Sequence, residues 1–160
     1  MSRIDHYIQA IILEGAAEAR QEGSAATEAH HLLLGIAAHE GTAAQRVLTS
    51  AGLGRQAVRD ALDREFERSL SVAGVSLAAF DLPPVTPDPK ANPKLGSSAR
   101  LALERGFAAA KGKRDLRPAH LLLGVLDTEI GTVPRALALA GVDRAELMVR
   151  VRDTLPGEAW

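Results

Sequence analysis

The sequence predicts an all-α protein made of two pseudo-symmetric four-helix repeats, eight helices in all, joined by a proline-rich linker. The segment His31 to Gly35 reads His-Leu-Leu-Leu-Gly and returns unchanged 89 positions later as His120 to Gly124. Apolar residues beyond this segment keep the same shift and recur at the spacing of a buried helix face. In addition, 46% of the residues are hydrophobic but only 3% are aromatic, which favours packed helices. We expect no strands of structural importance.

The first repeat is expected to begin with two helices. The first starts at a cap supplied by Ser2 or Asp5 and ends near Gly23. Its apolar positions are Ile4, Ile8, Ile11, Ile12, Gly15, Ala16 and Ala19. Thr27 can cap a second helix that runs to His39. Because this second helix is apolar on nearly every side, it should lie in the middle of the bundle.

Two more helices complete the first repeat. Thr42 can cap a short third helix that ends near Ala51. The fourth helix carries Val58, Leu62 and Phe66 at intervals of four residues, and we expect these side chains to face inward. The charged residues on the same helix are expected to face solvent: Arg55, Arg59, Asp63 and Arg68.

The second repeat shows the same order of helices. They are predicted over residues 97–111, 116–127, 132–140 and 143–155. Pro118 and Pro134 each fall in a first turn, where a missing backbone N–H costs nothing.

The chain is expected to form one domain over residues 1–160. Repeat one takes residues 1–70, a linker takes 71–95, and repeat two takes 96–156. Five of the eight prolines lie in the linker, which predicts an extended and irregular connection.

Composition excludes several classes of function. The formal net charge is −1, so no overall field attracts nucleic acid or a membrane surface. No run approaches the roughly 20 apolar residues of a membrane helix, and no secretory signal follows Met1. The absence of cysteine removes disulfides and thiol chemistry. The sequence therefore indicates a soluble, cytoplasmic protein with neither a nucleic acid nor a membrane as partner.

The densest basic cluster consists of Lys111, Lys113, Arg114 and Arg117. A solvated loop is the favoured interpretation, because the whole chain has one Trp, one Tyr and three Phe, too few to stack bases. The segment 106–114 resembles a phosphate-binding loop only superficially, since its spacing is wrong and no strand precedes it.

The histidines do not form a metal-binding motif. His30, His31 and His39 lie on one predicted helix without the spacing of zinc ligands. Because His31 and His120 recur in both halves, we expect them to cap or bridge helices inside each repeat. The sequence offers no nucleophile motif either. We predict no enzyme activity, no ATP hydrolysis, no metal and no cofactor.

The duplicated unit resembles the Clp repeat, the N-terminal domain of Clp ATPases, most closely that of the ClpC type. The resemblance rests on the segments His31 to Gly35 and His120 to Gly124, on the Ala-Gly turns before the fourth helices, and on the linker. It covers nearly the whole chain, here as a stand-alone copy without ATPase modules. It implies a module that recognises substrates and adaptors for an ATPase ring feeding a protease. The implied partners are peptides or unfolded substrates, cyclic peptide antibiotics and Clp components.

Two features depart from the family pattern. The family usually has a Glu directly before the histidine of each second helix, and in ClpC-type domains this Glu belongs to a phosphoarginine pocket. In this sequence the two corresponding positions are His30 and Ala119. The family also has Phe-Thr before helices one and five, near where cyclic peptide antibiotics dock. The corresponding residues here are Ile4-Asp5 and Pro93-Lys94. The resemblance thus implies aliphatic contacts with hydrophobic or cyclic peptides, and weak or no binding of phosphoarginine.

We expect the ligand-binding surface between the repeats, where the start of helix one meets the linker exit and helix five. The expected lining residues are Ile4, Ile8 and Ile12 on one wall, and Pro93, Leu95 and Leu101 on the other. The alternative is a helical interaction module for a partner unrelated to proteolysis, because a fold does not fix a function.

Overall fold

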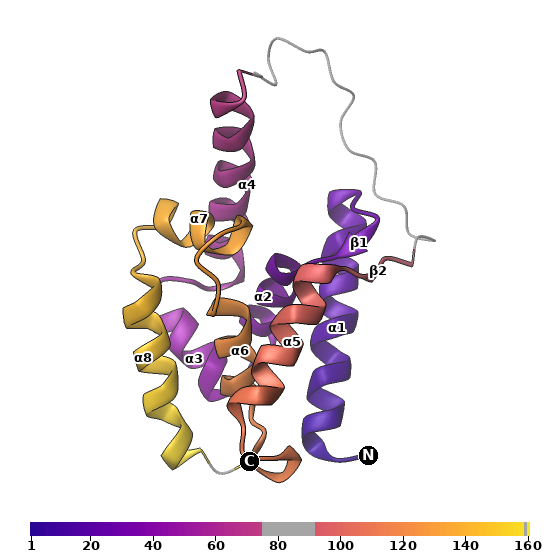
Figure 1. Ribbon diagram of the computed structural model, residues 1–160, viewed down its shortest axis with the longest axis vertical. Helices are drawn as coiled ribbons and strands as arrows, with labels where there is room; N and C mark the ends of the chain where they lie inside the picture. The colour runs from indigo at the N-terminus through magenta and orange to yellow at the C-terminus, as the bar shows by residue number, and fades with distance from the viewer. Residues whose placement is uncertain (75–91, 159) are drawn as a thin grey trace.

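A computed structural model describes residues 1–74, 92–158 and 160. This part of the chain contains eight α-helices, two 3₁₀ helices and one pair of two-residue strands (Figure 1). The first half holds α1 (Arg3–Glu22), α2 (Ala29–Ala38), α3 (Ala43–Ser50) and α4 (Arg55–Val72). The second half holds α5 (Ser97–Ala109), α6 (Pro118–Leu126), α7 (Thr132–Leu139) and α8 (Arg144–Thr154). The short elements are β1 (Ala26–Thr27), β2 (Lys94–Leu95), η1 (Lys113–Asp115) and η2 (Leu155–Gly157).

The predicted all-α class and its two four-helix repeats are confirmed. Helices α6, α7 and α8 begin 89 residues after α2, α3 and α4 respectively. The repeats differ mainly in helix length. Helix α1 has 20 residues against 13 in α5, and α4 has 18 against 11 in α8. The extra turns of α4 project beyond the rest of the bundle (Figure 1).

The second helix of each repeat forms the centre of the core, as its composition predicts. All nine residues of α6 and seven of the ten in α2 are buried. A Cβ added to Gly35 would lie 2.9 Å from the carbonyl oxygen of Ile11, and one added to Gly124 would lie 2.9 Å from the Cα of Gly106. Both distances are too short for a real contact, so these glycines let α2 approach α1 and α6 approach α5 closely.

A short parallel strand pair corrects the predicted cap of α2. Ala26 pairs with Lys94, and Thr27 pairs with Leu95. Thr27 therefore lies in a strand, and Glu28 is the residue that precedes the helix. The pair fixes the connection between α1 and α2 against the start of α5.

The structure describes only the ends of the predicted linker. Helix α4 continues to Val72, and Lys94 with Leu95 forms β2, so regular structure extends into both ends of the range 71–95. Residues 75–91, which hold four of its five prolines, lie outside the described residues.

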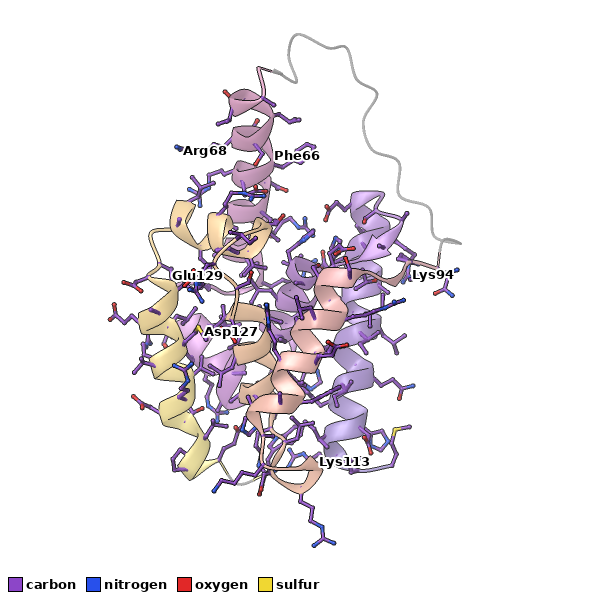
Figure 2. All side chains as sticks on the ribbon, in the orientation of Figure 1. Phe66, Arg68, Lys94, Lys113, Asp127 and Glu129 are labelled. Atoms are coloured by element: carbon purple, nitrogen blue, oxygen red, sulfur yellow. The ribbon has the colours of Figure 1, made fainter. Side chains whose placement is uncertain are left out.

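The inward face predicted for α4 is right for Val58 and Leu62 but wrong for Phe66. Val58 and Leu62 are buried, whereas Phe66 is 57% exposed. Figure 2 shows the reason, since Phe66 and Arg68 lie on the part of α4 that projects past the other helices. The four-residue spacing of apolar side chains continues to Phe66, but this part of α4 lies beyond the core.

The charged face of α4 is not wholly solvated either. Arg55 and Arg59 both bind the carboxylate of Glu18, a residue of α1 that is 3% exposed. Glu65 is also buried and accepts a hydrogen bond from Arg135 of α7 at 2.8 Å. These ion pairs connect α4 to α1 and α7. Arg55 still faces outward as expected, with a side chain that is 46% exposed, whereas the side chain of Arg59 is 21% exposed.

Candidate functional site

His31 and His120 occupy equivalent places at the start of α2 and α6. Nδ1 of His31 accepts a hydrogen bond from the backbone N–H of Glu28 at 2.9 Å, and Nδ1 of His120 accepts one from the N–H of Arg117 at 3.0 Å. Each histidine thus satisfies a backbone donor beside the first turn of its helix. The expectation that these residues cap helices inside each repeat is confirmed.

Glu22, at the end of α1, forms a cluster with His30 and His31. Nε2 of His31 lies 2.7 Å from one carboxylate oxygen of Glu22, and Nε2 of His30 lies 3.4 Å from the other. Burial by itself would raise the pKa of Glu22, but the hydrogen bonds from both histidines outweigh burial and lower that pKa. Sequence spacing missed this cluster because Glu22 comes from a different helix.

The same three side chains resemble a set of metal ligands, with one ligand atom from each within 4.8 Å of the others. The hydrogen bonds of His31 oppose this use. Its Nδ1 faces the N–H of Glu28, so the ring proton belongs on Nε2, directed at Glu22. A metal on Nε2 would require the proton on Nδ1, against another N–H. The arrangement therefore suits a connection between helices, and we retain the prediction of no metal site.

Two neighbouring hollows open beside the start of α1. The first, here called the α1–α5 hollow, has a volume of about 260 Å³ and is lined by Asp5, Ile8, Phe107, Gly112, Lys113 and Leu116. The second, the basic hollow, has a volume of about 380 Å³ and is lined by Ser2, Arg3, Ile4, Lys113, Arg114, Leu116, Arg117 and Trp160. Because Lys113 and Leu116 line both, the two hollows adjoin.

A salt bridge connects the two sides of the α1–α5 hollow. Nζ of Lys113 lies 3.0 Å from a carboxylate oxygen of Asp5. Hydrogen bonds from Ser2, with a further contribution from Lys113, lower the pKa of Asp5 to about 2. The rim therefore carries a fixed pair of opposite charges, while Ile8 and Phe107 supply apolar walls.

The three predicted isoleucines lie along α1 but differ in burial. Ile4 is only 6% exposed and lines the basic hollow. Ile8 and Ile12 are partly buried and pack against the core, and Ile8 lines the α1–α5 hollow.

Pro93, Leu95 and Leu101 lie toward the other end of α5. Leu95 belongs to β2, Pro93 directly precedes that strand, and Leu101 is in the second turn of α5. Figure 2 shows Lys94 and Lys113, which flank α5, at opposite ends of that helix. The start of α1 thus meets η1, beyond the end of α5. None of the hollows described here is lined by residues of both predicted walls, whereas Ile8 shares the α1–α5 hollow with Phe107 and Leu116.

Two further hollows flank the start of α2 and share His30 and Thr132. One, of about 260 Å³, lies between α5 and the α6–α7 connection and includes Leu101. The other, of about 600 Å³, lies between α1 and α4 and includes Phe66. Much of the wall of this larger hollow consists of the ion pairs of Glu18 with its two arginines.

The near-match to a phosphate loop consists of the end of α5, a bend at residues 110–112 and the start of η1. Gly106 is buried inside α5, and Lys113 pairs with Asp5. None of the helices within the described ranges is long and apolar enough to cross a membrane.

Comparison with known proteins agrees with the repeat architecture. A family model described as the Clp repeat (R) N-terminal domain matches residues 3–105. The chain is also similar to the chaperone protein ClpB of Corynebacterium efficiens, with 33% identity over 66 residues. That match covers 41% of this chain and 8% of the length of the relative. On the family match and the duplicated helix order, the chain belongs to the family of Clp repeat N-terminal domains.

Proposed function

We propose that this protein is a non-catalytic module of the Clp system that binds peptides, unfolded substrates, adaptors or cyclic peptide antibiotics, and so modulates or shields a Clp ATPase–protease. Its family supports a Clp-related interaction role. The observation that carries the binding role is the pair of adjoining hollows at the start of α1, where apolar walls meet a few charged groups. Ligand sites commonly combine these two properties.

In this proposal the α1–α5 hollow receives an apolar side chain of the bound peptide. Ile8 and Phe107 flank it, and Leu116, which is 5% exposed, lies at its base. The pair of Asp5 and Lys113 offers an acceptor and a donor for the peptide backbone. A volume of about 260 Å³ suits one or two side chains, which fits a short segment of an unfolded chain.

Two matched alanine variants on α5 test this placement. Phe107 and Leu101 are 45% and 44% exposed, but only Phe107 lines the α1–α5 hollow. The probe is a fluorescein-labelled peptide Gln-Gln-Leu-Phe with blocked ends, titrated by anisotropy. We expect Phe107→Ala to weaken binding about tenfold, as for an aromatic contact residue, and Leu101→Ala to leave it unchanged. Weaker binding with Leu101→Ala and unchanged binding with Phe107→Ala would instead favour a site at the predicted wall of Pro93, Leu95 and Leu101.

The alternative function, an interaction module unrelated to proteolysis, would use a different surface. The observation that favours it is the exposed Phe66 on the projecting part of α4. Affinity capture from a lysate of the source cell, with this protein as bait, separates the two functions. Clp subunits that are recovered by the native chain and lost with Phe107→Ala support our proposal. Other proteins, retained with that variant and lost with Phe66→Ala, support the alternative.

We expect phosphoarginine to bind weakly or not at all. His30 is paired with Glu22, and Ala119 is fully buried, so neither position offers a free carboxylate to a guanidinium group. The neighbouring Glu28 carboxylate accepts a hydrogen bond from Ser98 at the start of α5. Isothermal calorimetry with free phosphoarginine checks this expectation, and micromolar affinity would contradict it.

A further inference from the structure

The basic hollow gathers cations from two separate parts of the sequence. Arg3 comes from α1, Lys113 and Arg114 come from η1, and Arg117 precedes α6. Neither aspartate nor glutamate is among its lining residues, although the whole chain carries a formal net charge of −1. The sequence favours a solvated loop for the last three because the whole chain has few aromatic residues to stack bases. The structure adds Arg3 and the only tryptophan of the chain, Trp160.

Most of this positive charge is not neutralised by neighbouring groups. Lys113 pairs with Asp5, whereas the guanidinium group of Arg117 donates, among the described residues, to the neutral carbonyl groups of Arg114 and Leu116, at 2.9 and 3.1 Å. The guanidinium carbon of Arg3 lies 4.7 Å from the centre of the Trp160 ring. The side chain of Arg114 makes no hydrogen bond or salt bridge to any residue that the structure describes. Three guanidinium groups are therefore available to one anionic ligand.

The acidic side chains near the hollow lie outside its lining. One carboxylate oxygen of Glu158, close to Trp160 in sequence, accepts a hydrogen bond from the backbone N–H of Ala43, and the other is buried without a partner among the described residues. Asp115 belongs to η1 but does not line the hollow. The local field is thus positive, and low salt should strengthen it because exposed charges are screened over about 10 Å at 0.1 M ionic strength.

The floor of the basic hollow is apolar. Ile4 and Leu116 are 6% and 5% exposed, and the indole of Trp160 covers one side. Cations above an apolar floor fit a carboxylate side chain next to an aliphatic or aromatic one. A nucleic acid fits less well, because its binding requires a longer track of cations and several stacking groups.

We propose that the basic hollow binds acidic side chains of a peptide whose neighbouring apolar residue occupies the α1–α5 hollow. This inference rests on the proposed function and adds a chemical preference to it. The shared residues Lys113 and Leu116 make the two hollows continuous, so residues adjacent in one peptide can reach both. Acidic residues beside an apolar residue are therefore the recognised pattern.

Trp160 provides a direct readout, since it is the only tryptophan and lines the basic hollow. The probes are two peptides with blocked ends, Glu-Glu-Leu-Phe and Gln-Gln-Leu-Phe. At 50 mM salt we expect the acidic peptide to bind about tenfold more tightly and to change Trp160 fluorescence. We expect this preference to shrink at 500 mM salt because the charges are screened.

Charge reversal at one residue tests the site against a matched control. Arg114→Glu should weaken binding of the acidic peptide about tenfold and leave the neutral peptide nearly unaffected. Arg100→Glu makes the same change of net charge on an exposed residue at the other end of α5 and should have little effect. Neither side chain is buried, so both variants should remain folded, which circular dichroism verifies.

The outcomes separate this inference from the proposed function. Equal affinity for the two peptides, or binding of the acidic peptide that Arg114→Glu does not change, would overturn the acidic preference while peptide binding stands. Failure of both peptides to bind would count against both proposals. Displacement of the acidic peptide by a lower concentration of a twelve-residue oligothymidylate would show that the hollow prefers nucleic acid, which would also overturn the inference.

Discussion

His31 and His120 cap equivalent helices, but their surroundings differ. Each accepts a backbone N–H through Nδ1, and only His31 also binds a carboxylate, that of Glu22. We expect His31→Ala to lower the free energy of unfolding by about 2–4 kcal/mol, because it removes the cap and the bond to Glu22 and leaves a cavity at a fully buried position. His120→Ala should cost about 1–2 kcal/mol. Urea denaturation of the two variants checks the order, and equal losses would show that the bond to Glu22 contributes nothing.

His120 also predicts a dependence of stability on pH. Burial, followed by the charge of Arg117, lowers the pKa of His120 from its ordinary value of 6.5. A histidine whose pKa is lower in the folded state contributes stability that is complete above pH 6.5 and is lost as the pH falls below it. We expect His120→Gln, whose side-chain oxygen can still accept the N–H of Arg117, to flatten part of this decline. Urea midpoints at pH 7.5, 6.5 and 5.5 provide the measurement, and parallel declines in both proteins would contradict the assignment.

At the scale of the helix, α4 shows where periodicity stops predicting burial. Leu62 and Phe66 are four residues apart on one face, yet Leu62 is 5% exposed and Phe66 is 57% exposed. We expect Leu62→Ala to cost about 2–4 kcal/mol in unfolding free energy and Phe66→Ala to change it by less than about 0.5 kcal/mol. Thermal or urea denaturation gives both numbers. A large loss with Phe66→Ala would mean that the end of α4 is covered in solution.

Helix order could be predicted from the sequence, but the contacts between helices could not. The starts of α2, α3 and α4 recur in α6, α7 and α8 because repeated apolar positions and capping residues are local signals. The bond from Glu22 to His31 and the pairing of Glu18 with Arg55 depend on which helices lie side by side. The spacing of residues along the chain does not show which helices are neighbours, so the sequence does not predict these polar contacts.

At the scale of the whole molecule, the same limit explains the candidate site. The sequence singled out Ile8 and the basic residues after α5, and the structure places both beside the start of α1. The sequence could not show that α1 and α5 run in opposite directions. This arrangement places Phe107, at the end of α5, near the start of α1, and places Leu95 and Leu101 toward the other end. Nor could the sequence place Trp160, the last residue, next to Arg3. The candidate site forms only when segments distant in the sequence pack together, whereas the repeat is visible in the local spacing of apolar residues.

Packing between the repeats predicts that neither repeat folds alone. Helix α2 contacts α5, α6 and α7, while α3 contacts α6 and α8 and α4 contacts α7, and buried residues of both repeats form one continuous cluster. A separate fragment of residues 1–74 or 92–160 would expose the leucines at the centre of its second helix, and so small a core offers little net stability. We expect each purified fragment to show weak helicity by circular dichroism and poorly dispersed amide resonances, and an equimolar mixture to regain the helicity of the full chain. Cooperative unfolding of the first fragment alone would show that repeat one is an independent folding unit.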